Sequence, residues 1–101
     1  MSKLYIDDMR HPEDSSWDLV KDTSSAIEYV EMFGCPEQIS FDYCLANGKT
    51  IMPFIEWLIE KDKQAKATFI PKNFRFDSHS SSVSGSAEIL FVLGNYLKTR
   101  F

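Results

Sequence analysis

The sequence predicts an α/β protein in which about four mostly parallel strands are joined by three helices. Short apolar runs that suit buried strands alternate along the chain with longer amphipathic segments that suit helices. The connections are short, which implies parallel pairing with right-handed crossovers. The 101 residues are 44% hydrophobic and 14% aromatic, which is enough apolar surface for the core of one domain spanning residues 1–101.

Four segments are predicted as strands. The apolar run of residues 3–7 ends abruptly at two aspartates, and residues 17–22 alternate as a weaker second strand would. Residues 38–43 form a third apolar run that again ends on an aspartate, and residues 74–79 form the last candidate.

The first helix has clear end signals. Ser25 and Glu28 have the spacing of a capping box, and Gly34 followed by Pro36 ends the helix. The apolar residues predicted to face the core from this helix are Ala26, Ile27, Val30 and Phe33.

Two further helices are predicted. Thr50 can cap a helix that runs to about Lys63 and that tolerates Pro53 in its first turn, where a missing N–H costs nothing. A closing helix over about residues 86–99 follows a loop rich in serine and glycine. The residues predicted to face the core are Ile51, Phe54, Ile55, Leu58 and Ile59 in the earlier helix and Ile89, Leu90, Leu93, Tyr96 and Leu97 in the closing one.

Composition excludes several classes of function. The formal net charge of -4 provides no field that attracts nucleic-acid backbone or anionic lipid, and no apolar stretch is long enough to cross a bilayer. Cys35 and Cys44 form neither a disulfide framework nor a zinc-site spacing, which favours the cytoplasm. The aromatic residues are spaced as core residues, with no predicted base-stacking platform.

Polar residues follow three of the predicted strands. Asp7 and Asp8 end the first strand, Asp42 ends the third and His79 ends the last. Because ligands bind beyond the carboxyl ends of parallel strands, we expect these side chains to converge at one edge of the sheet. Three carboxylates would repel one another unless a hard cation such as Mg²⁺, the neighbouring Arg10 or a raised pKa offset their charge.

Each of these arrangements suits phosphate chemistry. The serine-rich loop, with its hydroxyls, a glycine-permitted bend and the N–H groups of a helix start, would add an anion site. His79 could act as acid or base near neutral pH. The structural alternatives are aspartates that close turns, a hydrogen-bonded structural histidine and a loop that only caps the last helix.

Three segments in order, LYIDDMRHP, ISFDYCLANGKT and FDSHSSSVSG, resemble the cyclic-phosphate processing receiver family, an offshoot of the response-regulator receiver fold. The matching positions are Asp7, Asp8, Arg10 and Pro12, then Asp42, then Trp57 and Leu58, and finally His79, Ser80 and Gly85. The resemblance implies a flavodoxin-like three-layer sandwich, reduced by loss of the helix that ordinarily joins the first two strands. It also implies processing or binding of a cyclic phosphate on an RNA end or a nucleotide derivative.

The chain departs from the family pattern at three positions. Tyr43 and Cys44 stand where the family has His and Asp, and Ser82 stands where it has Asn. These changes remove two acid/base or metal-binding groups, so catalysis is weakened or absent while anion binding survives. No later strand supplies the lysine of a phosphorelay receiver, so Asp42 is not expected to be a conventional phosphoacceptor. The small size also suits a phage-encoded accessory protein in the host cytoplasm.

The leading hypothesis is binding, with hydrolytic opening if the site is competent, of a cyclic phosphate by a cyclic phosphodiesterase-type hydrolase. Asp7, Asp8 and Asp42 would hold Mg²⁺ or orient water, and His79 would transfer protons. The predicted phosphate-binding residues are Arg10, Ser80, Ser82 and Gly85. The competing hypothesis is a catalytically inactive receiver-like module that binds a host or regulatory protein.

Overall fold

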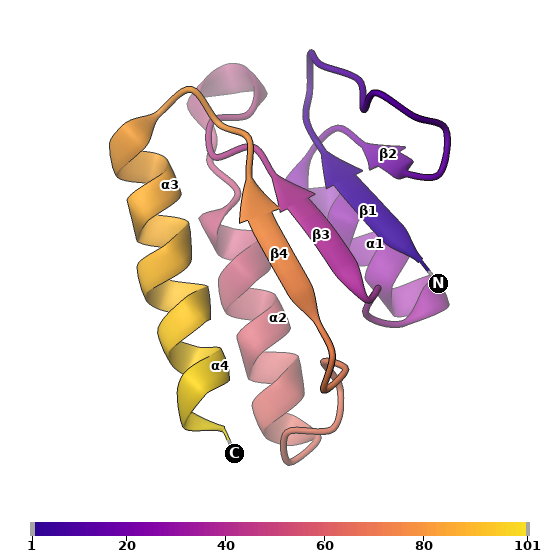
Figure 1. The fold of residues 1–101 in the computed structure, drawn as a ribbon, viewed down its shortest axis with the longest axis vertical. Helices are drawn as coiled ribbons and strands as arrows, with labels where there is room; N and C mark the ends of the chain where they lie inside the picture. Colours follow the sequence, from indigo (N-terminus) through magenta and orange to yellow (C-terminus); the bar gives the residue numbers. More distant parts are fainter. Residues whose placement is uncertain (1, 101) are drawn as a thin grey trace.

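A computed structural model describes residues 2–100 and contains one four-stranded sheet (Figure 1). The strands are β1 (Lys3–Ile6), β2 (Asp18–Val20), β3 (Gln38–Phe41) and β4 (Arg75–Ser78). All neighbours pair in parallel in the order β2-β1-β3-β4, with Ile6 opposite both Val20 and Phe41. The predicted receiver-like α/β fold is confirmed.

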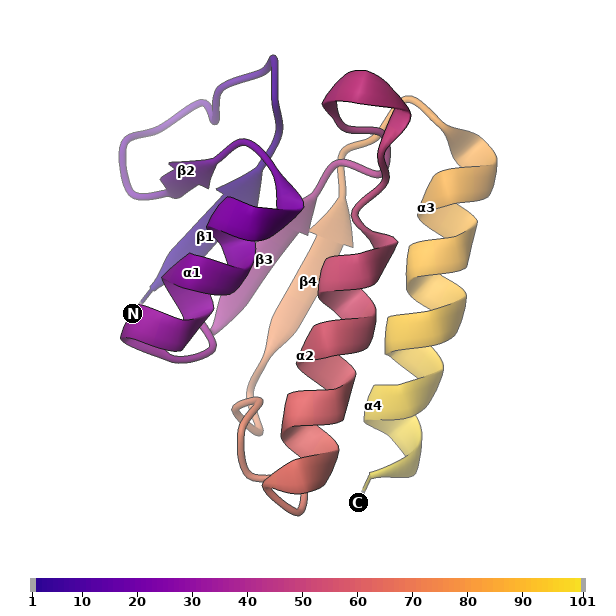
Figure 2. The same cartoon turned by 180° about the vertical axis from the view of Figure 1, so that it is seen from behind.

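The helices all pack on one face of the sheet, where α1 and α2 lie in front of the strands in the view from behind (Figure 2). They are α1 (Thr23–Phe33), η1 (Ala46–Gly48), α2 (Met52–Gln64), α3 (Val83–Ile89), η2 (Leu90–Gly94) and α4 (Asn95–Thr99). A π-helical turn, η2, joins α3 and α4 into one continuous helix. Among residues 2–100, none of these helices has both the length and the apolar character needed to cross a bilayer.

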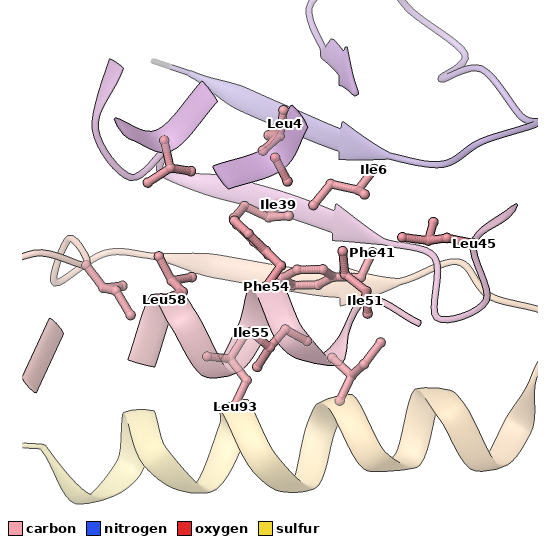
Figure 3. Packing of buried hydrophobic residues seen from close by; sticks show 14 residues of the cluster. Leu4, Ile6, Ile39, Phe41, Leu45, Ile51, Phe54, Ile55, Leu58 and Leu93 are labelled. Atoms are coloured by element: carbon pink, nitrogen blue, oxygen red, sulfur yellow. The ribbon is translucent and has the colours of Figure 1, made fainter. Parts of the chain in front are cut away.

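Alternation along the strands separates the two faces of the sheet. Leu4 and Ile6 of β1 are fully buried toward the helices, and so are Ile39 and Phe41 of β3. Figure 3 shows how these side chains meet residues of α2 and of the last helix to form the core. The opposite face is bordered by the connection of residues 8–17 and by no helix within the described part of the chain, in keeping with the implied loss of the helix after β1.

Three helix starts differ from the prediction. Ile51, and not Thr50, is the N-cap of α2, although the Thr50 hydroxyl accepts from the Met52 N–H at 3.3 Å. The other two starts have a different polar cap or an earlier first residue. Asp22, and not Ser25, caps α1, because its carboxylate accepts a hydrogen bond from the Ser25 backbone N–H at 2.8 Å. Ser82 caps the last helix by accepting from the Gly85 N–H at 3.0 Å, so this helix begins three residues earlier than predicted. In both places a short polar side chain upstream satisfies an N–H group of the first turn.

Two apolar residues predicted to face the core are instead exposed. Phe33 is 69% exposed in the last turn of α1, where its ring contacts only the neighbouring Tyr29 at 5.0 Å among the described aromatic pairs. Leu90 is 64% exposed because the buried face of the last helix is centred on Ile89 and Leu93, which are both fully buried. The other predicted core positions in these helices are buried or partly buried.

A buried carboxylate, Asp62, ties the end of α2 to the rest of the chain. Its Oδ1 accepts from the backbone N–H groups of Phe69 and Ile70 at 3.0 and 2.7 Å, and its Oδ2 accepts from Tyr96 and Arg100 at 2.7 and 2.9 Å. Burial alone would raise the pKa of Asp62, but these hydrogen bonds and the Arg100 charge hold it below its ordinary value. The cluster is structural and lies apart from the strand-end acids.

Candidate functional site

Three carboxylates meet at the carboxyl edge of the sheet. One oxygen from each of Asp7, Asp8 and Asp42 lies within 4.8 Å of the others. The backbone positions them, because the Asp7 N–H donates to Val20 O and the Asp42 N–H donates to Ile6 O, each at 3.0 Å. These bonds extend the parallel ladder one residue past the strands and bring the acids of two strands together.

Asp7 is a buried carboxylate with three hydrogen-bond partners. Its Oδ1 accepts from the backbone N–H groups of Met9 and Arg10 at 2.8 and 2.9 Å, and its Oδ2 lies 2.9 Å from His79 Nε2. Burial alone would raise the pKa of Asp7, but these hydrogen bonds and the histidine outweigh it and hold the pKa below its ordinary value. Asp7 is therefore ionised at neutral pH.

His79 links Asp7 to the middle strand. Because an ionised carboxylate only accepts hydrogen bonds, His79 Nε2 must donate to Asp7. In the neutral imidazole Nδ1 then accepts from the Ser40 hydroxyl, whose Oγ lies 2.7 Å away. The Tyr5 ring stacks on the imidazole at 4.2 Å, with 8° between the planes. Both ring nitrogens are thus held by protein groups, which suits a histidine that orients Asp7.

Asp42 differs from Asp7 in its electrostatic surroundings. Burial and the negative charge of Asp7 raise the pKa of Asp42, against the opposing effects of a hydrogen bond from Ser80 and the nearby His79 and Arg10. The two neighbouring carboxyl groups are therefore shifted in opposite directions, a pattern typical of paired acids at functional sites.

The donor set of these acids fits Mg²⁺. All three groups offer hard carboxylate oxygens, and their 4.8 Å spread is close to the roughly 4.2 Å between opposite ligands of an ion bound at about 2.1 Å. Asp7 uses three of its roughly four acceptor positions on protein donors, which leaves one for a cation. A cation would also relieve the repulsion that raises the pKa of Asp42.

The predicted phosphate-binding residues are not all in one place. Arg10 lies beside the acids, where its Nη1 donates to the backbone oxygen of His79 at 2.8 Å, and Ser80 is hydrogen-bonded to Asp42. The Ser82 hydroxyl is occupied as the cap of α3. Gly85 lies buried inside α3, so the glycine bend predicted for this loop is wrong.

The side chains that depart from the family pattern have partners outside the acid cluster. The Tyr43 hydroxyl donates to Glu88 Oε1 at 2.8 Å, and its ring covers Gly85 so closely that an added Cβ there would lie 2.3 Å from Tyr43 Cγ. Cys44 is exposed, and its backbone forms an isolated antiparallel β-bridge with Thr50. Tyr43 is therefore part of the contact between the β3–α2 connection and α3.

A hollow of about 320 Å³ opens beside Asp8. Lys21 and Lys49 line it from two different connections, together with Asn47 and the first residues of α1. Lys21 and Lys49 are not among the predicted site residues, because neither occupies a position that matches a motif. Tyr5 and Ser40, which support His79, are likewise absent from the predicted site, although parallel pairing of residues 5 and 40 on one face of the sheet is the signal that could have found them.

Comparison with known proteins supports the interpretation drawn from the motifs. No curated protein and no solved structure gives a significant match. A family model described as "Cyclic-phosphate processing Receiver domain" matches residues 2–95, nearly the whole chain. The chain therefore belongs to the family of cyclic-phosphate processing receiver domains.

Proposed function

We propose that this protein binds a cyclic phosphate at the carboxyl edge of its sheet, with Mg²⁺ held by Asp7, Asp8 and Asp42. The observation that carries the proposal is the cluster of three carboxylates in which burial and the Asp7 charge raise the pKa of Asp42. Such a cluster gains most from a ligand that brings a cation with it. Family membership supports a cyclic phosphate as the anion that accompanies the cation.

Cationic side chains flank the acids on two sides. Arg10 approaches through its bond to the backbone of His79, and Lys21 and Lys49 line the hollow next to Asp8. Arg10 and these lysines would neutralise the phosphate oxygens, while the Ser80 hydroxyl would move from Asp42 to the phosphate. Ser82 and Gly85 would act indirectly by fixing the start of α3.

Hydrolysis, as the second part of this proposal, would open the phosphate ring. A water oxygen forms a bond to phosphorus, one ring P–O ester bond breaks, and the released alkoxide takes up a proton, which leaves a phosphomonoester and a hydroxyl group. Asp42 would accept a hydrogen bond from the attacking water through the carboxylate oxygen that does not hold the cation, and the water proton would pass through solvent to the released alkoxide. His79 would hold Asp7 in place. Bound Mg²⁺ would supply positive charge to the phosphoryl oxygens.

Thermal unfolding and phosphorus NMR test the two parts separately. With Mg²⁺ and a nucleoside 2′,3′-cyclic phosphate at about 100 times its Kd, the free energy of unfolding should rise by about 2.7 kcal/mol. Asp42→Asn should lose this gain, and the matched control Asp77→Asn, which removes an exposed carboxylate from β4, should keep it.

The outcomes of this test distinguish binding from turnover. A monoester signal that appears with the unmodified protein and not with Asp42→Asn would support hydrolysis. Stabilisation without a monoester would leave a binding protein and remove the hydrolytic step. No stabilisation by any cyclic phosphate, with or without Mg²⁺, would refute the proposal.

A protein-interaction module is the second candidate, and one observation favours it. Three large apolar residues of the last helix, Val83, Leu90 and Phe91, are 86%, 64% and 70% exposed. Exposed apolar residues close together on one element are typical of contact surfaces. This candidate would be supported if the protein forms a stoichiometric complex with another protein, loses it on Phe91→Ser, and binds no cyclic phosphate.

A further inference from the structure

A second hollow lies on the sheet face on which no helix packs among residues 2–100. It has a volume of about 460 Å³, within the range of small-molecule sites, and lies between β1 and the connection of residues 8–17. Its lining is Tyr5, Arg10, His11, Pro12, Glu13, Asp14 and Trp17. Two aromatic residues thus line a space large enough for a nucleobase.

Two residues that line this hollow also contact groups of the acid site. Tyr5 lines the hollow and stacks on His79, which in turn holds Asp7. Arg10 also lines the hollow, and its backbone N–H and guanidinium bind Asp7 and the His79 backbone. These contacts make the hollow a neighbour of the acid site, and a ligand whose phosphate lies at the acids could extend into it.

The aromatic side chains are held in fixed positions. The Trp17 ring meets the Tyr5 ring edge-on, with centroids 5.8 Å apart and 75° between the planes. The Lys3 ammonium lies 4.6 Å from the centre of the Trp17 ring. A ring held by two neighbours loses little freedom when a ligand stacks on it, which favours binding.

The chemistry of the hollow suits an uncharged base better than a second phosphate. Stacking on an aromatic ring is available to every base, and Arg10 can add a planar cationic contact. The Glu13 carboxylate also lines the hollow, where it would repel a phosphate but accept a hydrogen bond from the amino group of a base. The other hollow is lined by two lysines beside Asp8 and Asp22, and by no aromatic residue, so it offers a base no ring to stack on.

We propose that the ligand is a nucleoside cyclic phosphate whose base stacks on Trp17 in this second hollow while its phosphate lies at Asp7, Asp8 and Asp42. This inference rests on the proposed function and adds a binding site for the base of the ligand. It concerns a free nucleotide, since the net charge of -4 disfavours an extended polynucleotide.

The first test uses the unmodified protein and two probes. Adenosine 2′,3′-cyclic phosphate and 1-O-methylribose 2,3-cyclic phosphate carry the same phosphate ring, and only the first carries a base. With Mg²⁺ present, calorimetry should show the adenosine probe binding about 5- to 150-fold more tightly, the gain expected from one stacked base. Equal affinity of the two probes would overturn the base site while leaving phosphate binding intact.

The second test follows the fluorescence of Trp17, the proposed stacking partner of the base. The chain has two tryptophans, so Trp57→Phe leaves Trp17 as the only indole. Its fluorescence should be quenched saturably by the adenosine probe and unchanged by the base-free probe. Trp57 lies on α2 against Phe54 and Phe69, so Trp57→Phe alone should leave both affinities unaltered.

Substitution of Trp17 completes the test. Trp17→Ala should weaken the adenosine probe to the affinity of the base-free probe and should leave the base-free probe unchanged, while Trp17→Phe should keep part of the difference. An adenosine affinity that survives Trp17→Ala would place the base elsewhere and overturn the inference. Failure of both probes to bind the unmodified protein would instead overturn the proposed function on which the inference rests.

Discussion

The contact between Gly85 and Tyr43 leads to a prediction that opposes simple helix propensity. Gly85 lies inside α3, where replacing glycine by alanine ordinarily stabilises a helix by about 1 kcal/mol. Here an added Cβ would lie 2.3, 2.5 and 2.8 Å from Cγ, Cδ2 and Cβ of Tyr43. Rotation of the ring cannot relieve the contact with Tyr43 Cβ, so the backbone of α3 or of residue 43 must move.

The size of the effect follows from opposing contributions. Overpacking of this kind costs about 1–3 kcal/mol and sometimes more. Displacement of α3 would also weaken the hydrogen bond from Tyr43 to Glu88, which is worth about 1 kcal/mol. After the gain in helix propensity, Gly85→Ala should lower the free energy of unfolding by about 1–3 kcal/mol, or lower Tm by at least about 4 °C.

Urea unfolding of two matched variants measures this effect. Gly94→Ala is the control in the same continuous helix, because its Cβ would lie at ordinary distances of 3.5 Å from Leu90 and 3.9 Å from Phe76. Gly94→Ala should be neutral or stabilising by up to about 1 kcal/mol. The cost of Gly85→Ala should shrink in a Tyr43→Ala background, which removes the two closest atoms. A Gly85→Ala protein as stable as the unmodified one would refute the close contact between Gly85 and the Tyr43 side chain.

Three further predictions concern buried groups. Because the folded pKa of Asp62 is depressed, its stabilising effect is present above the ordinary value of 3.8 and is lost as pH falls through the folded pKa. In urea unfolding, Asp62→Asn should therefore lower the free energy of unfolding by about 3 kcal/mol at pH 7 and by progressively less below pH 3.8. A loss of stability that does not change with pH would contradict this prediction. Leu93→Ala should lower the free energy of unfolding by about 2–5 kcal/mol through the cavity it leaves between α2 and the last helix, and a loss under 1 kcal/mol would show that the side chain is not buried there. Ser40→Ala should lower the free energy of unfolding by about 1 kcal/mol and shift the NMR signals of the His79 ring nitrogens. Unchanged signals would contradict the hydrogen bond between Ser40 and His79.

Much of the fold could be predicted because its signals are local. The apolar runs of β1 and β3 end where polar residues begin, and parallel connection follows from the alternation with helices. Pro53 at the start of α2 and Gly34 at the end of α1, with a φ of 85°, have the positions that their backbone preferences require.

Other features depend on contacts between distant segments, which local patterns do not contain. Asp22 and Ser25 are both suitable capping residues, and the position at which α1 begins decides that Asp22 is the cap. Gly85 suggests a flexible loop by composition, yet its role is to admit the Tyr43 ring. Trp17 has the spacing of a core residue, but within the described part of the chain no helix covers its side of the sheet, and it borders a hollow. In each case tertiary packing decides among locally acceptable alternatives.

The pairing of Asp7 with His79 has a consequence for how the protein matures. The two residues are 72 positions apart, and the imidazole reaches Asp7 only when β4 has joined β3. During synthesis, at about 5–20 residues per second, the nascent chain exposes its acidic pair for several seconds before the histidine emerges. A chain truncated before residue 79 would thus keep Asp7 and Asp8 and lack the histidine that contacts Asp7, so the pairing of Asp7 with His79 forms only after β4 has been made.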